Sequence, residues 1–124
     1  MAQRLAHSLR EAAALVGVGG PTHLILRASP DLLCRNLFCE HVGGPCTCRL
    51  AMSLEKVQNV EVLDISDNSL KVLPDVICAL QKLRHLDLSG NELSTLPRGL
   101  GGLPHLEVLR TAGNPLSAKE LSAL

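Results

Sequence analysis

The second half of the chain repeats one pattern of apolar and polar positions. Residues 60–82 and 83–105 align at a period of 23 residues and are identical at eight positions. Within each copy the apolar residues alternate over L-x-L, which predicts a short strand with Leu63 and Ile65 pointing inward and Asp64 pointing outward. The identical pairs are Leu63/Leu86, Asp64/Asp87, Ser66/Ser89, Asn68/Asn91, Leu70/Leu93, Leu73/Leu96, Pro74/Pro97 and Leu80/Leu103.

The remainder of each copy is predicted to turn back and close a coil. Asn68 and Asn91 follow the strands, where a side-chain amide can both donate to and accept from backbone groups that no sheet satisfies. Leu70 and Leu73 are expected to fill the same layer, and Pro74 stiffens the return segment, which needs no backbone N–H there. Each coil then has flat apolar faces that only a neighbouring coil can cover.

The full pattern, L-x-x-L-x-L-x-x-N-x-L-x-x-L-P-x-x-L-x-x-L-x-x, resembles the leucine-rich repeat family in its 23-residue, LP-containing intracellular form. The resemblance implies an α/β fold, a short solenoid with parallel strands on its concave face and an irregular or helical convex side. It also implies helical caps at the N- and C-terminal ends. The implied function is that of a non-enzymatic module that binds a protein partner and needs no cofactor.

Both ends of the array depart from the repeat. A third copy keeps Asn114 but lacks LP, and Ser117 followed by Glu120 forms a capping box that predicts a short helix from about Ala118. Residues 2–16 are rich in helix formers and are expected to form a helix that covers the first coil. We therefore divide the chain into residues 1–59, a helix, a strand and an irregular Cys-containing insertion that cap the array, and residues 60–124, the repeats 60–82, 83–105 and 106–116 followed by the capping helix.

A further strand is predicted upstream of the regular repeats, at residues 23–27 (HLILR). We place Leu26 in the position of Leu86, which puts Asp31 in the position of Asn91. This alignment makes a degenerate repeat of 37 residues, with the extra residues near Cys34 to Cys48.

Charge and hydropathy limit the kinds of partner and the cellular compartment that we expect for the protein. The net charge is zero, which argues against nucleic-acid binding. No window approaches the roughly 20 apolar residues of a membrane span, so membrane insertion is not expected. Residues 1–30 contain Arg4, Arg10 and Arg27 against the single acid Glu11, a composition that also suits a removable mitochondrial presequence. We expect a cytoplasmic protein, with mitochondrial import as the alternative.

Four of the five cysteines lie close together, in the spacing C-x4-C-x-H-x4-C-x-C formed by Cys34, Cys39, His41, Cys46 and Cys48. A zinc site, a pair of disulfides and free thiols in an irregular insertion are the alternatives. Structural zinc sites usually contain C-x2–4-C pairs, and the C-x-C pair strains a tetrahedral chelate, so no metal site is expected.

The fifth cysteine, Cys78, lies in the second half of a good repeat. We interpret it as a buried or half-buried thiol.

Function is expected at positions that change between copies or point outward from the strands. Asp64 and Asp87 share one position and should lie on adjacent strands, as a polar ladder and not as an acid–base pair. The predicted partner-binding residues are Val62, Asp64, Ser66, His85, Asp87, Ser89, Val108 and Arg110.

Two rival functions remain open at this point. The chain could be a subunit or fragment that self-associates through incompletely capped ends, because about three coils are near the minimum for a stable array. It could also be a zinc- or thiol-dependent protein that uses residues 34–48.

Overall fold

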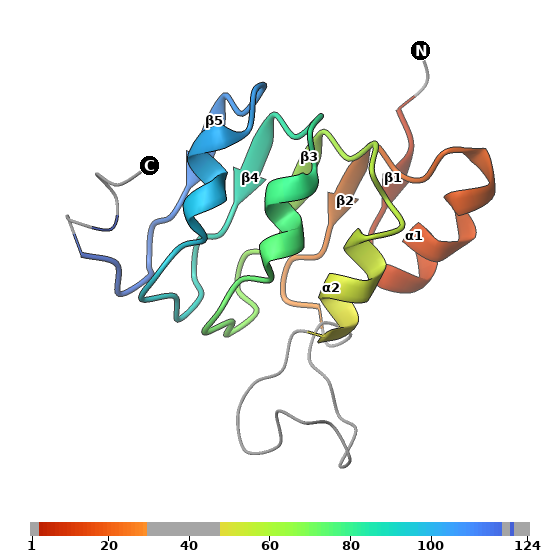
Figure 1. Cartoon of the computed structure of the whole chain (residues 1–124). Helices are drawn as coiled ribbons and strands as arrows, with labels where there is room; N and C mark the ends of the chain where they lie inside the picture. The colour runs from red at the N-terminus through yellow and green to blue at the C-terminus, as the bar shows by residue number, and fades with distance from the viewer. Residues whose placement is uncertain (1–2, 30–47, 118–119, 121–124) are drawn as a thin grey trace.

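The computed structural model describes residues 3–29, 48–117 and 120, which form a row of stacked coils (Figure 1). Each coil contributes one strand to a common sheet, and a helix or helical turn follows each of the first four strands on the opposite side. The strands are β1 (Leu5–Ala6), β2 (His23–Ile25), β3 (Val62–Asp64), β4 (His85–Asp87) and β5 (Val108–Arg110). The helices are α1 (Leu9–Ala14) and α2 (Cys48–Leu54), with 3-10 helices η1 (Val16–Val18), η2 (Asp75–Ala79) and η3 (Arg98–Gly102).

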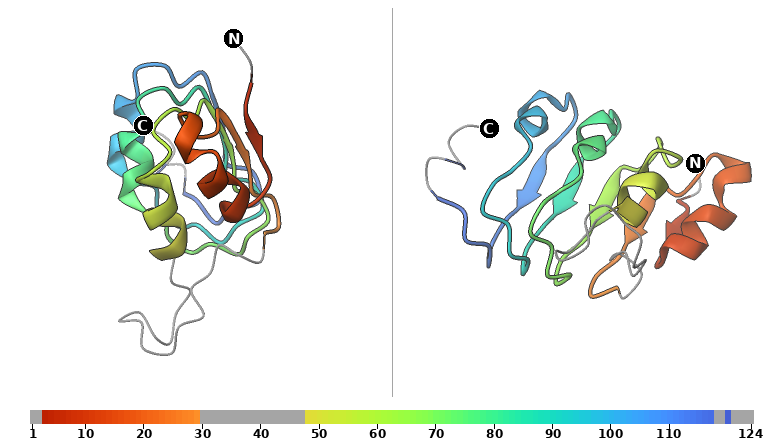
Figure 2. Two further views of the ribbon diagram at one scale, coloured as in Figure 1. Left: turned by 90° about the vertical axis from the view of Figure 1, so that its right-hand side faces the viewer. Right: turned by 60° about the horizontal axis from the view of Figure 1, so that its bottom comes forward.

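The strands form one parallel sheet in the order β1-β2-β3-β4-β5. The helical elements line up on the other side, where α1 contacts α2, α2 contacts η2 and η2 contacts η3. Seen along the row, the strands form one wall and the helices form the other (Figure 2). This arrangement confirms the predicted α/β solenoid with parallel strands on one face and helical segments on the other.

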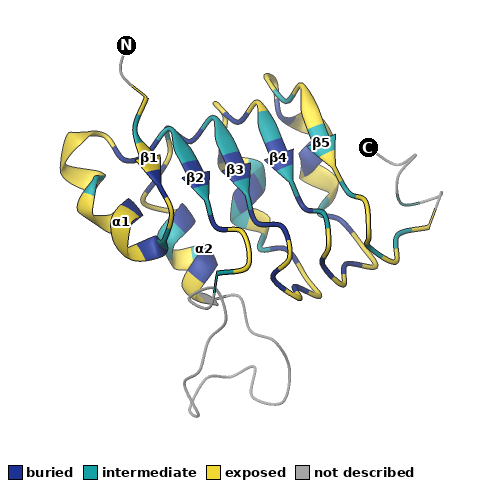
Figure 3. Cartoon of the chain, turned by 180° about the vertical axis from the view of Figure 1, so that it is seen from behind, coloured by how far each residue is buried: buried dark blue, intermediate teal, exposed yellow. Residues whose placement is uncertain are grey.

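The core consists of aliphatic side chains stacked from coil to coil. Leu24, Leu63 and Leu86 are paired in register and fully buried. On the helical side, Ile77 and Leu100 are buried at the equivalent positions of η2 and η3. Figure 3 shows that burial alternates along β2, β3 and β4, with the inward residue dark and its neighbours partly exposed. The shared pattern of leucines therefore accounts for the core and leaves the outward strand positions free for other roles.

The asparagine that follows each of β3, β4 and β5 connects neighbouring coils. In Asn91, Oδ1 accepts hydrogen bonds from the backbone N–H groups of Asn68 (2.9 Å) and Leu70 (3.1 Å). Its Nδ2 donates to the carbonyl oxygens of Ile65 (3.0 Å) and Leu88 (2.9 Å). Asn68 and Asn114 make equivalent bonds. The predicted double role of this side-chain amide is confirmed.

The N-terminal residues differ from the prediction in two ways. The helix predicted over residues 2–16 is the shorter α1, because Leu5 and Ala6 pair with β2 as a strand. Ser8 ends the extended segment and caps α1 by accepting a hydrogen bond from the backbone N–H of Glu11 (3.0 Å).

The predicted register of β2 is wrong by two residues. Leu24, not Leu26, pairs with Leu63 and so takes the position of Leu86. Leu26 instead follows the strand as a second buried residue. Ser29 then takes the position of the asparagine, and its backbone N–H donates to Asn68 Oδ1 at 2.8 Å.

Burial decreases in the last described coil. Leu106 and Leu109 are only partly buried, whereas Leu83 and Leu86, their equivalents one coil earlier, are fully buried. Ser117 Oγ accepts a hydrogen bond from the backbone N–H of Glu120 (3.1 Å), as the predicted capping box requires. The helix predicted from Ala118 otherwise lies outside the described residues.

Candidate partner-binding surface

The outward side chains of the sheet form two columns on the face turned away from the helices, which we call the strand face. Neighbouring members of a column lie on adjacent strands, about 4.8 Å apart along the sheet. The Val–His column consists of Leu5, His23, Val62, His85 and Val108. The Asp–Arg column consists of Ile25, Asp64, Asp87 and Arg110.

Apolar side chains alternate with imidazoles along the Val–His column. Leu5 and Val108, at its two ends, are 52% and 38% exposed. His23, Val62 and His85 between them are half-buried. The column therefore offers apolar contacts and polar ring nitrogens together on a backbone held by the sheet.

The carboxylates of the Asp–Arg column also hold the turns that follow the strands. Asp64 Oδ1 accepts hydrogen bonds from the backbone N–H (3.0 Å) and the hydroxyl (2.6 Å) of Ser66. Asp87 binds Ser89 in the same way, at 3.0 and 2.6 Å. Both bonds go to Oδ1, so Oδ2 of each aspartate is left for other donors.

The environment of Asp87 favours its charged form. Partial burial is the largest single influence and acts to raise the pKa of Asp87, but the hydrogen bonds from the hydroxyl and backbone N–H of Ser89 and the charges of Arg110 and His85 together outweigh it. The net result is a lowered pKa. Asp87 thus stays negative well into acidic pH beside the positive Arg110.

A shallow hollow of about 390 Å³ lies where the strands begin. Arg84 lies in its lining and forms ion pairs with Glu61 (3.8 Å) and Glu107 (3.3 Å) on the two neighbouring coils. His23 and His85 of the Val–His column border the same hollow. The charged row Glu61, Arg84 and Glu107 therefore lines the same hollow as the imidazoles of the strand face.

The predicted site residues fall into three groups. Val62, His85 and Val108 lie together in the Val–His column, and Asp64, Asp87 and Arg110 lie together in the Asp–Arg column. Ser66 is only 1% exposed and Ser89 is half-buried, and both hydroxyls are bonded to aspartates. We therefore leave these two serines out of the surface proposed below.

Sequence reasoning missed the part of the strand face contributed by the first two coils. Leu5 lies in the segment expected to be a helix, and the predicted register puts Ile25 instead of His23 in the position of His85. The row Glu61, Arg84 and Glu107 does carry a signal, since charges of alternating sign recur at a spacing of 23 residues.

The cysteine segment cannot be placed on this surface. Cys34, Cys39, His41 and Cys46 lie outside the described residues, as does the side chain of Cys48. Elsewhere in the described chain, no three His, Cys, Asp or Glu side chains are grouped closely enough to hold a metal ion. Cys78 is a half-buried free thiol on the helical side, and burial, assisted by the nearby Asp75 carboxylate, raises its pKa.

No helix in residues 3–29 or 48–117 is long and apolar enough to cross a membrane.

The stacked parallel strands, the asparagine ladder and the 23-residue period together define a solenoid repeat protein. The family model described as "Leucine rich repeat" matches residues 55–116, half of the chain. The chain belongs to the leucine-rich repeat family, whose members are typically non-enzymatic protein-interaction modules.

A solved leucine-rich repeat protein from Leptospira interrogans is also similar to this chain. It is 26% identical, with a TM-score of 0.48, and the match covers 56% of this chain and 24% of the other. The chain therefore spans about a quarter of that protein. No curated protein sequence matches significantly.

Proposed function

We propose that the protein binds a protein partner through the strand face, the concave side of the solenoid. The observation that carries this proposal is the Val–His column, in which the exposed Leu5 and Val108 and the half-buried Val62 alternate with two imidazoles. Apolar side chains held on a rigid sheet contribute most to binding when a partner covers them, because no flexible segment must be ordered.

The size and charge of this surface suggest the kind of interface. Five strands span about 19 Å at the usual strand spacing, so the strand face alone supports a small or transient interface. The Asp–Arg column adds two carboxylates and one guanidinium beside the apolar positions. A fitting partner presents apolar side chains flanked by basic groups that reach Asp64 and Asp87.

The role we propose is non-enzymatic. The paired carboxylates Asp64 and Asp87 each bind the serine of their own turn, which suits a structural ladder more than acid–base work. Compartment, self-association and the chemistry of the cysteine segment stay predictions.

The test is affinity purification with variants of the strand face. Val62→Glu/Val108→Glu places charge at two apolar positions and should abolish capture of the partner. Val72→Glu is the matched control, since Val72 is 61% exposed and lies between β3 and η2, away from the strand face. Circular dichroism checks that all variants fold. A partner captured equally by wild type and both variants would refute binding through the strand face.

A further inference from the structure

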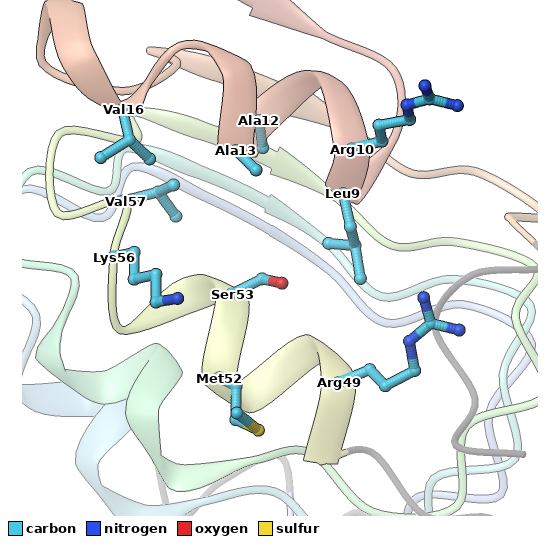
Figure 4. A pocket seen from close by; sticks show the side chains of 10 residues that line it. All are labelled: Leu9, Arg10, Ala12, Ala13, Val16, Arg49, Met52, Ser53, Lys56 and Val57. Atoms are coloured by element: carbon cyan, nitrogen blue, oxygen red, sulfur yellow. The ribbon is translucent and has the colours of Figure 1, made fainter. Parts of the chain in front are cut away.

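A second hollow lies on the opposite side of the molecule, between α1 and α2 (Figure 4). We call it the helix groove, and its volume is about 540 Å³, within the range of ligand-binding clefts. Its floor is apolar, formed by the buried Leu9, Ala12 and Val57. Met52 and Val16 on its walls are 61% and 42% exposed. Such exposure of large apolar side chains beside a cleft is typical of a binding surface.

The charged residues that line the helix groove are all positive. Arg10 projects from α1 and Arg49 from α2, both near the first residues of their helices, and Lys56 follows α2 (Figure 4). Among the residues that the structure describes, no carboxylate lines the groove. Within the described part of the chain, none of these three cations takes part in an ion pair.

Glu11, next to Arg10 in the sequence, forms no ion pair with a described residue. Its Oε1 accepts a hydrogen bond from the backbone N–H of His7 (2.9 Å), which holds the carboxylate at the start of α1. The groove therefore combines an apolar floor with unpaired positive charge on both of its walls, although the whole chain has no net charge.

We propose that the helix groove binds an acidic amphipathic helix of a partner protein. A helix laid between α1 and α2 would place apolar residues spaced at i, i+3 and i+4 against the exposed Met52 and Val16, over the apolar floor. Glutamates flanking that apolar stripe would then meet Arg10 and Arg49. A hollow between two helices suits the rounded surface of a third helix better than a flat bilayer. This site is separate from the strand face and does not depend on its function.

The probe is a synthetic helix with leucines at i, i+3, i+4 and i+7 and glutamates at the flanking positions. A second peptide has the same leucines but lysines in place of the glutamates. Titration into isotopically labelled protein, followed by nuclear magnetic resonance, should shift the amide signals of α1 and α2 with the acidic peptide only. Added salt should weaken the binding, because exposed ion pairs are screened.

Charge reversal gives the sharpest comparison. Arg10→Glu/Arg49→Glu should lower the affinity for the acidic peptide about tenfold or more and should create binding of the lysine peptide. Lys71→Glu/Arg98→Glu makes the same change in net charge at exposed positions outside the groove and should leave binding unchanged. Should the double arginine variant fail to fold, Met52→Glu tests the same wall, and it too should weaken binding of the acidic peptide.

Three results would overturn the proposal. The first is an absence of shifts with the acidic peptide, or shifts confined to the strand face. The second is equal binding of the two peptides, or no effect of the charge reversals. The third is binding of phosphatidylserine vesicles without binding of the acidic peptide, which would assign the groove to a membrane surface.

Discussion

Replacing Asn91 by alanine should remove a large part of the stability of the solenoid. The side chain is only 4% exposed and bonds five backbone groups on two coils. Alanine leaves three of them without this partner, the N–H groups of Asn68 and Leu70 and the carbonyl of Ile65, whereas the carbonyls of Leu88 and Ser89 each keep another donor. Each buried polar group left unsatisfied costs roughly 1–3 kcal/mol, so the sum is about 3–9 kcal/mol.

Local relaxation and entry of water reduce this sum, and we expect a loss of about 3–5 kcal/mol from a total stability of about 5–15 kcal/mol. Urea unfolding followed by far-ultraviolet circular dichroism measures it. The chain has no Trp or Tyr, so intrinsic fluorescence offers little signal.

Two further alanine variants make the comparison specific. Asn114 bonds four backbone groups in the same way but is only half-buried, so water can replace part of what is lost. Asn114→Ala should therefore lose roughly 1–2 kcal/mol. Glu92→Ala, at an exposed neighbour of Asn91, should change stability by less than about 0.5 kcal/mol. The reasoning is refuted if Asn91→Ala loses no more stability than Asn114→Ala.

Two other changes give predictions of defined direction. Gly90→Ala should destabilise the fold by about 1–3 kcal/mol, because φ at Gly90 is +70° and the new Cβ would clash with Oδ1 of Asp67. Gly102→Ala is the control: its new Cβ meets no atom within 4 Å, so the melting temperature should be unchanged or slightly higher. Equal melting temperatures for the two variants would contradict this. Because the pKa of Asp87 is lowered on folding, its charged form contributes stability above the unfolded pKa of about 3.9, and this contribution is lost as pH falls through the folded pKa. Asp87→Asn should accordingly have a lower free energy of unfolding than wild type at neutral pH, and it should lose less of that free energy on acidification. If the variant and wild type show the same dependence of stability on acid pH, the charge of Asp87 does not contribute to stability.

The regular repeats could be predicted from sequence because each residue that is identical in the two copies has one structural role. The inward Leu63 and Leu86 fill equivalent layers, and Asn68 and Asn91 satisfy equivalent turns, so a single alignment at 23 residues fixed strand, turn and register together. The same alignment placed Val62, His85 and Val108 in one column.

The first two coils could not be aligned in this way. In HLILR either Leu24 or Leu26 can be aligned with the inward strand residue Leu86. An asparagine at the position of Asn91 would have identified the correct alignment, but Ser29 occupies that position. β1 has only two residues, inside a segment whose composition favours helix, and pairing with β2 is what makes it a strand. The helix groove was missed for the same reason, since it depends on two helices that pack side by side but begin 39 residues apart in the sequence.

The central claim, that a partner binds the strand face, is tested most directly by site-specific photocrosslinking in cells. A photoreactive amino acid replaces Val108 in one variant and the more exposed Val72 in another. The account predicts a discrete crosslinked product from position 108 and none from position 72, and that Val62→Glu removes the product. The same product from both positions, or one from position 72 alone, would contradict it.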